Sequence, residues 1–140
     1  MPVANINSAW ESGDLVFRNA AKTAIATFAD TGASLALKRP VEYVTGDQLA
    51  TITEGIILLN KGSAIALTLA APVTGTDDGK ILHIRSETAQ AHTITLTSGT
   101  FNGGATTVAT LTAAIANGIS LVAYLGTWWV FEDINVASYA

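Results

Sequence analysis

The sequence predicts an all-β protein, and we expect an antiparallel β-sandwich of jelly-roll type with nine or ten short strands and an N-terminal arm. Two observations lead to this fold class. Apolar and polar residues alternate with a period of two along most of the chain, which is typical of half-buried strands. Turn-forming residues interrupt these runs at short intervals, and no stretch shows a convincing helical period.

The N-terminal part of the sequence predicts an arm followed by hairpins. Residues 1–13 show little periodicity and carry one large aromatic residue, Trp10. We interpret them as an extended arm, with a loosely ordered terminus as the alternative. A single domain is expected over residues 14–140, with front hairpins over 14–54 and the main sandwich over 55–140.

Individual strands are predicted from the alternation and from the turns between them. In the front hairpins, the Thr- and Ile-containing run 20–29 is expected to return from a strand over 15–17. Farther along, apolar side chains occupy every second position at Ile65, Leu67 and Leu69, at Leu82 and Ile84, and at Ile94 and Leu96. Residues 119–125 and 128–134 predict a tight hairpin around Gly126, which can take a positive φ. No internal repeat is visible, so a propeller or a solenoid is not expected.

Three strands carry apolar side chains on both faces, although a sandwich strand should bury one face and expose the other to water. They are residues 56–59, most of 119–125, and the strand with the neighbours Trp128 and Trp129, whose side chains leave opposite faces. We therefore expect a covering element, which is the arm, a loop of the same chain or another subunit. Aromatic residues are enriched in protein interfaces, and the interface candidates are Trp10, Tyr124, Trp128, Trp129 and Phe131.

Charged residues are scarce and unevenly distributed. They make up 13% of the sequence, against roughly 25% in an average domain. All seven Lys and Arg residues lie between Arg18 and Arg85, and after Glu87 only Glu132 and Asp133 are charged. We interpret this distribution as a surface that other chains partly cover, with a neutral, Thr-rich solvent face as the alternative.

The composition also argues against several classes of function. The net charge of -4 is unfavourable for nucleic acid, whose affinity comes from cationic neutralisation of phosphates, and it does not favour an anionic membrane surface. No window of about 20 uninterrupted apolar residues predicts a membrane span, and the N-terminus lacks the pattern of a secretory signal. Because the sequence has no cysteine, disulfides, thiolate metal sites and cysteine nucleophiles are excluded.

No group of residues in the sequence predicts catalysis, a metal or a cofactor. His83 and His92 lie on predicted strands without the spacing of a metal site, and His83 shares the polar side of its strand with Arg85. The Asp-Asp-Gly run at 77–79 lacks the alternating oxygen ligands of a calcium loop, so we interpret it as a turn that Asp side chains stabilise. No Gly-x-Ser-x-Gly elbow is present. We therefore do not expect an enzyme.

Five short motifs follow one another in the second half of the sequence. They are Ala-Ala-Pro at 70–72, Asp-Gly-Lys at 78–80, Ala-His-Thr-Ile-Thr-Leu at 91–96, Phe-Asn-Gly-Gly at 101–104 and Gly-Thr-Trp-Trp-Val at 126–130. In this order they resemble the small all-β virion proteins of tailed bacteriophages, over about residues 56–137. The resemblance carries no catalytic residues, and similar β-domains occur in tail-fibre and receptor-binding proteins.

What the resemblance implies is a head decoration, or cement, protein. Such a protein is made in the host cytoplasm and forms a homotrimer on the capsid surface of the virion. Its partner is the major capsid protein, whose neighbouring subunits it clamps, and no nucleic acid or membrane takes part. The arm over residues 1–13 could add a strand to a capsid edge.

Two alternatives to the decoration protein stay open. The first is a tail-fibre or collar module, although such modules usually belong to longer chains. The second is a carbohydrate-binding sandwich, for which Trp128, Trp129 and Tyr124 could supply an aromatic platform. Binding to a glycan array would favour this second alternative, and co-sedimentation with empty shells would favour the decoration protein.

Overall fold

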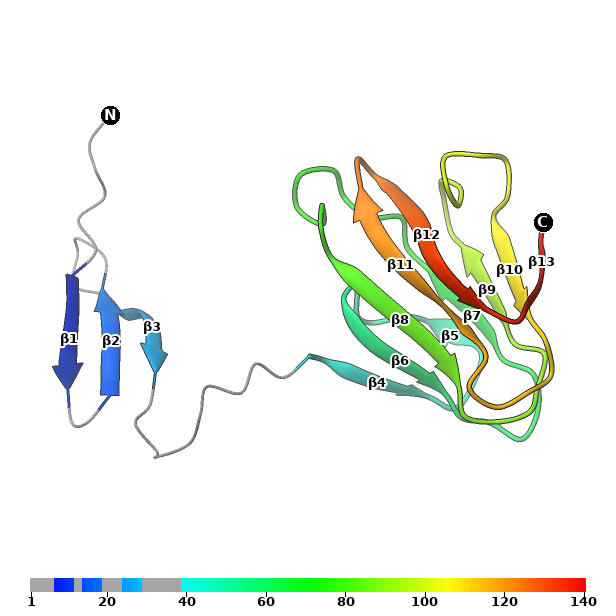
Figure 1. Ribbon diagram of the computed structural model, residues 1–140, viewed down its shortest axis with the longest axis horizontal. Coiled ribbons are helices and arrows are strands. Elements are labelled where there is room, and N and C mark those ends of the chain that lie inside the picture. The colour runs from blue at the N-terminus through cyan, green and yellow to red at the C-terminus, as the bar shows by residue number, and fades with distance from the viewer. Residues whose placement is uncertain (1–6, 12–13, 19–23, 29–38) are drawn as a thin grey trace. The chain divides into compact units, whose positions relative to one another are not determined.

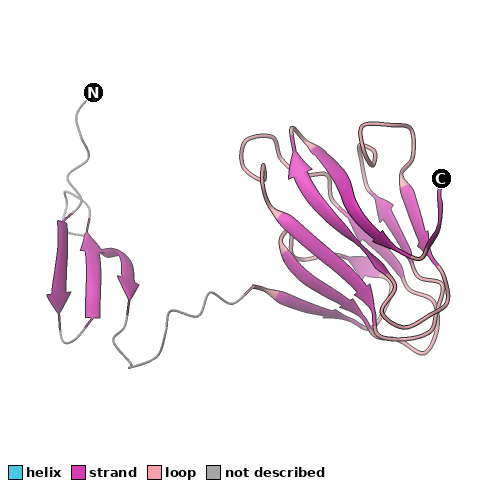
Figure 2. Ribbon diagram, viewed as in Figure 1, coloured by secondary structure: helices cyan, strands magenta, loops and turns pink. Residues whose placement is uncertain are grey.

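The computed structural model describes residues 7–11, 14–18, 24–28 and 39–140, which belong to two compact units, Met1–Lys38 and Arg39–Ala140. All regular secondary structure among the described residues is β-strand (Figure 1, Figure 2). The all-β prediction is therefore confirmed. The chain divides between Lys38 and Arg39, whereas the sequence predicts a boundary after residue 13.

The first unit holds a three-stranded antiparallel sheet in the order β1-β2-β3. Its strands are β1 (Asn7–Glu11), β2 (Asp14–Arg18) and β3 (Ala24–Phe28). Leu15 of β2 lies opposite Phe28 of β3, as the predicted return of the run 20–29 requires. β1 lies within the predicted arm but pairs with β2 along its whole length. A boundary after residue 13 would therefore separate two paired strands.

The second unit contains ten strands in two five-stranded sheets, one in front of the other (Figure 1). We name the sheets after the side chains on their outer faces. The aromatic sheet has the order β12-β11-β8-β6-β4, and the threonine sheet has the order β13-β10-β9-β7-β5. The strands are β4 (Val41–Val44), β5 (Gln48–Leu49), β6 (Gly55–Leu59), β7 (Ala66–Leu69), β8 (Ile81–Ser86), β9 (Thr93–Leu96), β10 (Val108–Leu111), β11 (Gly118–Tyr124), β12 (Thr127–Ile134) and β13 (Val136–Tyr139).

From β4 to β9 the chain alternates between the two sheets, so that successive strands within one sheet run parallel. In the aromatic sheet, β4, β6 and β8 pair in parallel, with Val41 opposite Ile56 and Ile56 opposite His83. In the threonine sheet, β5, β7 and β9 do the same, with Leu67 opposite Ile94. Each strand of one sheet and the next strand of the other make one rung, and three such rungs are stacked as in a short solenoid.

The predicted antiparallel arrangement of jelly-roll type is wrong for these six strands. Alternation along a strand identifies its buried face, but side chains project to the same two faces whether the neighbouring strand is parallel or antiparallel. The expectation that no solenoid is present is corrected for a related reason. A rung needs apolar residues only at alternate positions. Successive rungs can therefore follow the same backbone path although their sequences are not similar.

The last four strands add antiparallel partners to both sheets. β10 pairs with β9 and β13, and β11 pairs with β8 and β12. The predicted hairpin of 119–125 and 128–134 is confirmed as β11 and β12. Its two-residue turn has positive φ at Leu125 (48°) and Gly126 (75°), the combination that matches the twist of a tight hairpin. The Leu125 N–H also donates to Asp78 Oδ1 at 2.8 Å, which ties the turn to the preceding loop.

One hydrophobic core, formed by the inner faces of both sheets, lies between them. Burial alternates along the strands: β6, for example, buries Ile57 and leaves Ile56 partly exposed. The largest fully buried side chains are Trp128 and Phe101. The Trp128 Nε1–H donates to the carbonyl oxygen of Ala70 at 2.8 Å, so this indole is both packed and hydrogen-bonded inside the unit.

Candidate functional site

The outer face of the aromatic sheet carries apolar side chains on all five strands. The strand register aligns them in rows, since Tyr43 lies opposite Leu58, and Val122 lies between Ile81 and Trp129. Several of the large side chains are well exposed. The apolar residues of this face are Val41, Tyr43, Ile56, Leu58, Ile81, Val122, Tyr124, Trp129 and Phe131. Strands with apolar side chains on both faces, expected from the sequence, thus lie side by side in one sheet.

The outer face of the threonine sheet has a different character. Thr68 lies opposite Thr95, and Thr93 lies opposite Thr110, so that partly exposed hydroxyl-bearing side chains form rows across it. The neutral, Thr-rich face, which is the alternative interpretation of the low charge content, therefore occurs on this sheet. Cover of the apolar face by other chains stays a prediction. Only the apolar face needs an explanation beyond solvation.

Four polar side chains form a hydrogen-bonded cluster in the middle of the aromatic sheet. Ser120 is fully buried, and its hydroxyl donates to Glu132 Oε2 at 2.8 Å and accepts from Arg85 Nη2 at 2.9 Å. Arg85 Nη2 also donates to Glu132 Oε2 at 2.8 Å. His83 Nδ1 lies 2.9 Å from Ser120 Oγ. Because the Ser120 proton is engaged by Glu132, His83 must donate from Nδ1.

This cluster is a closed network rather than a nucleophile with its base. A nucleophilic serine donates its proton to a histidine nitrogen, whereas Ser120 donates to a carboxylate and already accepts two hydrogen bonds. Burial and the charge of Arg85 lower the pKa of His83, which favours the neutral ring. The hydrogen bond from Ser120 and the charge of Arg85 lower the pKa of Glu132, which favours the carboxylate. The charges of Arg85 and Glu132 cancel, and the Ser120 hydroxyl links this ion pair to His83.

A β-bulge brings Phe131 and Glu132 to the same face. Ser120 pairs with Glu132, but the next residue of β11 pairs with Val130, so Phe131 has no partner across the strands. A bulge of this kind re-aims the side chains around it. The Phe131 ring meets the His83 ring edge to face, with centroids 6.2 Å apart, while Glu132 reaches Ser120.

The five interface candidates differ in their exposure. Tyr124 (56% exposed), Phe131 (54%) and Trp129 (40%) lie on the outer face of the aromatic sheet. Trp128 is fully buried in the core, so its assignment as an interface residue is wrong. The alternation along β12 turns one of the two adjacent indoles inward and the other outward. Trp10 lies on β1, and its side chain is outside the described part of the structure.

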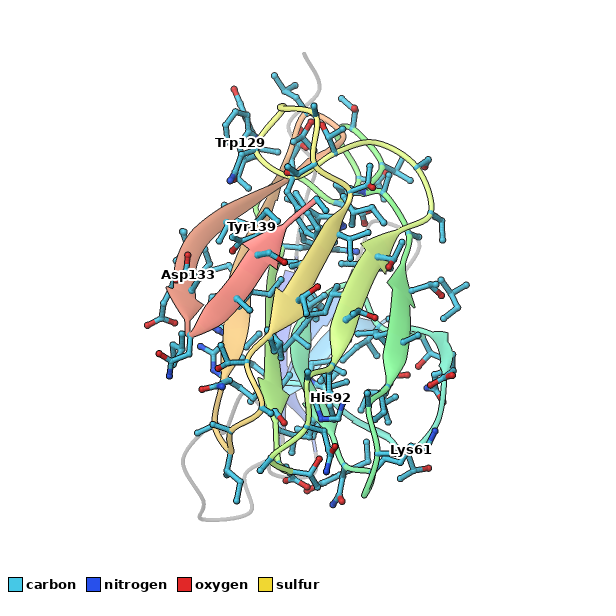
Figure 3. All side chains as sticks on the ribbon, turned by 90° about the vertical axis from the view of Figure 1, so that its right-hand side faces the viewer. Lys61, His92, Trp129, Asp133 and Tyr139 are labelled. Carbon is cyan, nitrogen blue, oxygen red and sulfur yellow. The ribbon has the colours of Figure 1, made fainter. Side chains whose placement is uncertain are left out.

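Trp129 is held in place by the loop that precedes β10 (Figure 3). Gly103 lies so close beneath the indole that a Cβ at this position would be 3.7 Å from the ring. Asn102 and Gly103 both have positive φ, and Asn102 Oδ1 accepts a hydrogen bond from the N–H of Val130 at 2.7 Å. The exposed indole is thus supported on one side by a loop that is hydrogen-bonded to its own strand.

An open depression of about 650 Å³ lies at the opposite end of the same face. β11 begins there with Gly118, which pairs with Arg85 and Ile134, and Tyr124 lies at the other end of β11. The residues that line the depression are Leu58, Asn60, Arg85, Ser86, Glu87, Ile115, Ala116 and Ile134. The sequence does not predict this depression, because strand ends and a loop from distant parts of the chain form it together. The available signal was Ile115, an apolar residue of a loop that is 66% exposed.

His92 is buried at the start of β9 and joins neighbouring segments of the chain. Its Nδ1 accepts a hydrogen bond from the N–H of Ile65 at 2.9 Å, so Nε2 carries the proton and faces Thr88 Oγ1 at 3.2 Å. Thr88 in turn donates to the carbonyl oxygen of Lys61, which lies near His92 in Figure 3. Burial lowers the pKa of His92. This histidine therefore supports the fold as a neutral ring.

The Asp-Asp-Gly run forms a turn that its carboxylates stabilise, as predicted. Asp77 accepts hydrogen bonds from the N–H of Val73 at 2.6 Å and from Lys80 Nζ at 2.7 Å, and the bond from Lys80 lowers the pKa of this carboxyl. Asp78 accepts from the N–H of Gly75 at 3.1 Å. Within the described ranges, no three Asp, Glu, His or Cys residues come together as a metal site.

Comparison with known proteins adds no family. No family model matches the chain, and a search of curated proteins finds no significant match. In the part of the chain that the structure describes, no helix is long and apolar enough to cross a membrane.

Proposed function

We propose that this chain is a β-sandwich head decoration protein of a tailed bacteriophage, which clamps neighbouring subunits of the major capsid protein. In this role it is made in the host cytoplasm, forms a homotrimer on the capsid surface and uses no cofactor, nucleic acid or membrane. The motif resemblance supports the phage assignment. The observation that carries an assembly role is the apolar outer face of the aromatic sheet, with its closed polar cluster.

The area of this face suits a specific protein contact. A covered aromatic side chain buries about 150–250 Å², so the exposed fractions of Tyr43, Tyr124, Trp129 and Phe131 together offer roughly 300–500 Å². The aliphatic side chains between them enlarge the patch toward the 800 Å² or so per partner of a standard interface. The largest apolar patch on a typical monomer measures about 300–600 Å². A partner chain is the simplest cover for such a surface.

The closed polar cluster makes burial of this face inexpensive. An unpaired charge would cost several kcal/mol on burial, on the order of what one contact gains. Here Arg85 and Glu132 neutralise each other and both bond to the Ser120 hydroxyl, so this ion pair needs no complementary charge from a partner. Several copies in one oligomer then act together, because each further contact forms at a high effective concentration.

Shell binding is the direct test of the proposal. We expect the chain to co-sediment with empty shells of the phage that encodes it, and Tyr43→Asp to weaken this binding at least tenfold. Tyr43 is 63% exposed on β4, at the margin of the aromatic sheet. The matched control is Leu49→Asp, because Leu49 is 51% exposed on β5 of the other sheet. Failure of the unchanged chain to bind these shells would refute the decoration role.

The predicted arm gives a second test of shell binding. Deleting residues 2–12 removes β1 from the first unit, and the second unit keeps all of its own strands. We expect the shortened chain to lose shell binding while its thermal unfolding stays cooperative. Shell binding equal to that of the full chain would show that the arm does not dock on the capsid.

A carbohydrate-binding role is the second candidate, and the exposed, loop-supported Trp129 favours it. The buried Trp128 no longer belongs to this platform, which leaves Trp129 and Tyr124. Glycan-array binding that Trp129→Ala abolishes, together with no binding to shells, would favour this candidate. A tail module is distinguished by an image of the native particle that locates the chain.

A further inference from the structure

We infer that Asn102 is a site of spontaneous covalent modification, at which the folded chain loses ammonia and forms aspartate and isoaspartate. The site lies in the turn over residues 101–104, in the loop that supports Trp129. The sequence contains two Asn-Gly pairs, 102–103 and 117–118, and their surroundings in the fold differ. The reaction is a property of this loop and is independent of the proposed function.

The reaction joins the main chain to the Asn102 side chain. Asparagine is thermolabile, and a following glycine leaves the main-chain nitrogen unhindered because it has no side chain. The Gly103 nitrogen forms a bond to Asn102 Cγ, the Cγ–Nδ2 bond breaks, and the proton of the Gly103 N–H ends on the departing ammonia. Water then opens the cyclic imide at Cγ to give aspartate, or at the main-chain carbonyl carbon to give isoaspartate. No group is oxidised or reduced.

Asn102 and Gly103 are the central residues of a type I′ turn. Their φ values are 56° and 64°, and the Gly104 N–H donates to the carbonyl oxygen of Phe101 at 3.1 Å. In such a turn the first central residue has a ψ of about +30°, which places the next nitrogen opposite Cβ across the Cα–C bond. A type II′ turn keeps the positive φ of this residue but has a ψ of about −120°, which places that nitrogen beside Cβ. A flip of one peptide unit, 102–103, therefore brings the Gly103 nitrogen to the Asn102 side chain.

The local structure permits this flip. Among the described residues, neither the carbonyl oxygen of Asn102 nor the N–H of Gly103 is hydrogen-bonded. The flip gives Gly103 a negative φ, which glycine adopts about as readily as a positive one. The bond between Gly104 and Phe101 is common to both turn types, so the flanking chain keeps its position.

The Asn102 side chain is held next to a donor that favours the attack. Its Oδ1 accepts a hydrogen bond from the N–H of Val130 at 2.7 Å. Negative charge develops on this oxygen when Cγ is attacked, and a fixed N–H donor at this distance stabilises a tetrahedral intermediate. Asn102 is exposed, so water reaches the departing Nδ2 and later the imide.

Asn117 has the same following residue, but the fold holds it in place. Its Nδ2 donates to the carbonyl oxygen of Thr112 at 3.0 Å, and its Oδ1 accepts from Asn135 Nδ2 at 2.9 Å. The carbonyl oxygen of Asn117 accepts from the Ser86 N–H at 2.8 Å, and Gly118 pairs with strands on both sides. The peptide unit 117–118 cannot flip without breaking the sheet. The fold therefore protects this pair.

Modification changes the support of Trp129. Isoaspartate adds a methylene to the main chain inside the turn, so the bond between Gly104 and Phe101 loses its present geometry. Gly103, where a Cβ would lie 3.7 Å from the indole, moves with the turn. We therefore expect isoaspartate to loosen the Trp129 ring.

Incubation of the full-length chain at mildly alkaline pH tests the reaction. Peptide mapping with tandem mass spectrometry locates the products, and circular dichroism establishes that the chain stays folded. We expect the folded chain to modify Asn102 at least about tenfold faster than Asn117. A parallel sample unfolded in urea should modify both at similar rates, because protection of Asn117 comes from the fold. The rate at Asn102 should rise with pH, since the Gly103 N–H must lose its proton.

Asn102→Gln is the matched variant, because its longer side chain disfavours formation of the ring. It should give no product at position 102 and leave the rate at Asn117 unchanged. A smaller ratio of the two rates in the folded chain would overturn the inference. An intact Asn102 in the folded chain, under conditions in which the unfolded chain reacts, would also overturn it.

The effect on Trp129 is measured on the isoaspartate form after chromatographic separation. In the proton–nitrogen NMR spectrum we expect the indole N–H signal of Trp129 to shift. The signal of Trp128, which is hydrogen-bonded to Ala70, should stay in place. An unchanged Trp129 signal would overturn the loosening of the ring.

Discussion

Trp128 and Trp129 are adjacent in sequence but have different roles in the structure. Trp128 is fully buried, and its Nε1–H is hydrogen-bonded to Ala70, so it belongs to the core. Trp129 lies over Gly103 with 40% of its surface exposed. Sequence alternation shows that one of the two faces outward, and only the fold shows which one.

This difference predicts opposite effects of truncation. We expect Trp128→Ala to lower the free energy of unfolding by about 3–5 kcal/mol, because it leaves a cavity in the core and an unpaired Ala70 carbonyl. Trp129→Ala should cost less than about 1 kcal/mol, since its ring is partly in water. Urea unfolding followed by circular dichroism measures both. Equal losses for the two variants would contradict the assigned orientations.

His92 makes stability depend on pH. Burial lowers the pKa of His92 below its ordinary value of 6.5, so the unfolded chain takes up a proton there before the folded chain does. The free energy of unfolding therefore rises as the pH increases from the lowered pKa of folded His92 toward 6.5. Above about pH 6.5 the contribution of His92 to stability is fully present. As the pH falls below about 6.5 the contribution is lost, because a protonated Nδ1 can no longer accept from Ile65. Urea unfolding between pH 8 and pH 5 measures the fall.

The contribution of His92 to the pH dependence of stability can be isolated by substitution. His83 also has a lowered pKa and acts in the same direction, so His83→Gln serves as the parallel variant. We expect His92→Gln to flatten the pH dependence more than His83→Gln does, because His83 is only partly buried. An NMR titration in which the His92 ring protonates at or above pH 6.5 would contradict the assignment.

Single elements were predictable wherever local chemistry determines them. Gly126 and the apolar runs on either side of it predict the β11–β12 hairpin, because turn geometry and strand alternation are local. The parallel pairing of Ile56 with His83 was not predictable, since pairing direction depends on where the intervening chain travels. The cluster of Ser120 with Glu132 depends on a bulge, which no alternation rule identifies.

Close pairing of β11 with β8 depends on Gly118. A Cβ at this position would lie 1.9 Å from the carbonyl oxygen of Ile84, which is backbone and cannot move aside. We expect Gly118→Ala to destabilise the protein by about 1–3 kcal/mol or more, through separation of the two strands. Gly46→Ala is the control, because nothing lies within 4 Å of a Cβ there. Thermal unfolding of both variants provides the comparison, and equal melting temperatures would show that the strands adjust freely.

The second unit, Arg39–Ala140, combines parallel rungs, an antiparallel cap and two unlike outer faces. Its core draws on both sheets, so neither sheet would bury its apolar face alone. The threonine face presents partly exposed hydroxyl groups to water, whereas the aromatic face exposes large apolar side chains around a hydrogen-bonded polar cluster. In the proposed function, only the aromatic sheet would contact other chains.

This unit should fold without the first one. Among the described strands, those of this unit pair only with one another, and the core residues that the structure describes lie within 39–140. We expect the fragment 39–140 to unfold in a single cooperative transition within a few degrees of the full chain. A fragment without cooperative unfolding would show that residues 1–38 are needed for the core. Near-UV circular dichroism, which reports the packing of Trp128, follows the transition.

The winding from β4 to β9 has a consequence for how this protein can change in length. Each rung contacts only its immediate neighbours in the stack, and β4 and β5 lie at the margin of their sheets. An additional rung could be inserted at this margin in the course of evolution without altering the hairpin of β11 and β12 at the opposite margin of the aromatic sheet. Related chains with a different number of rungs could thus keep the same aromatic side chains at the β11–β12 margin.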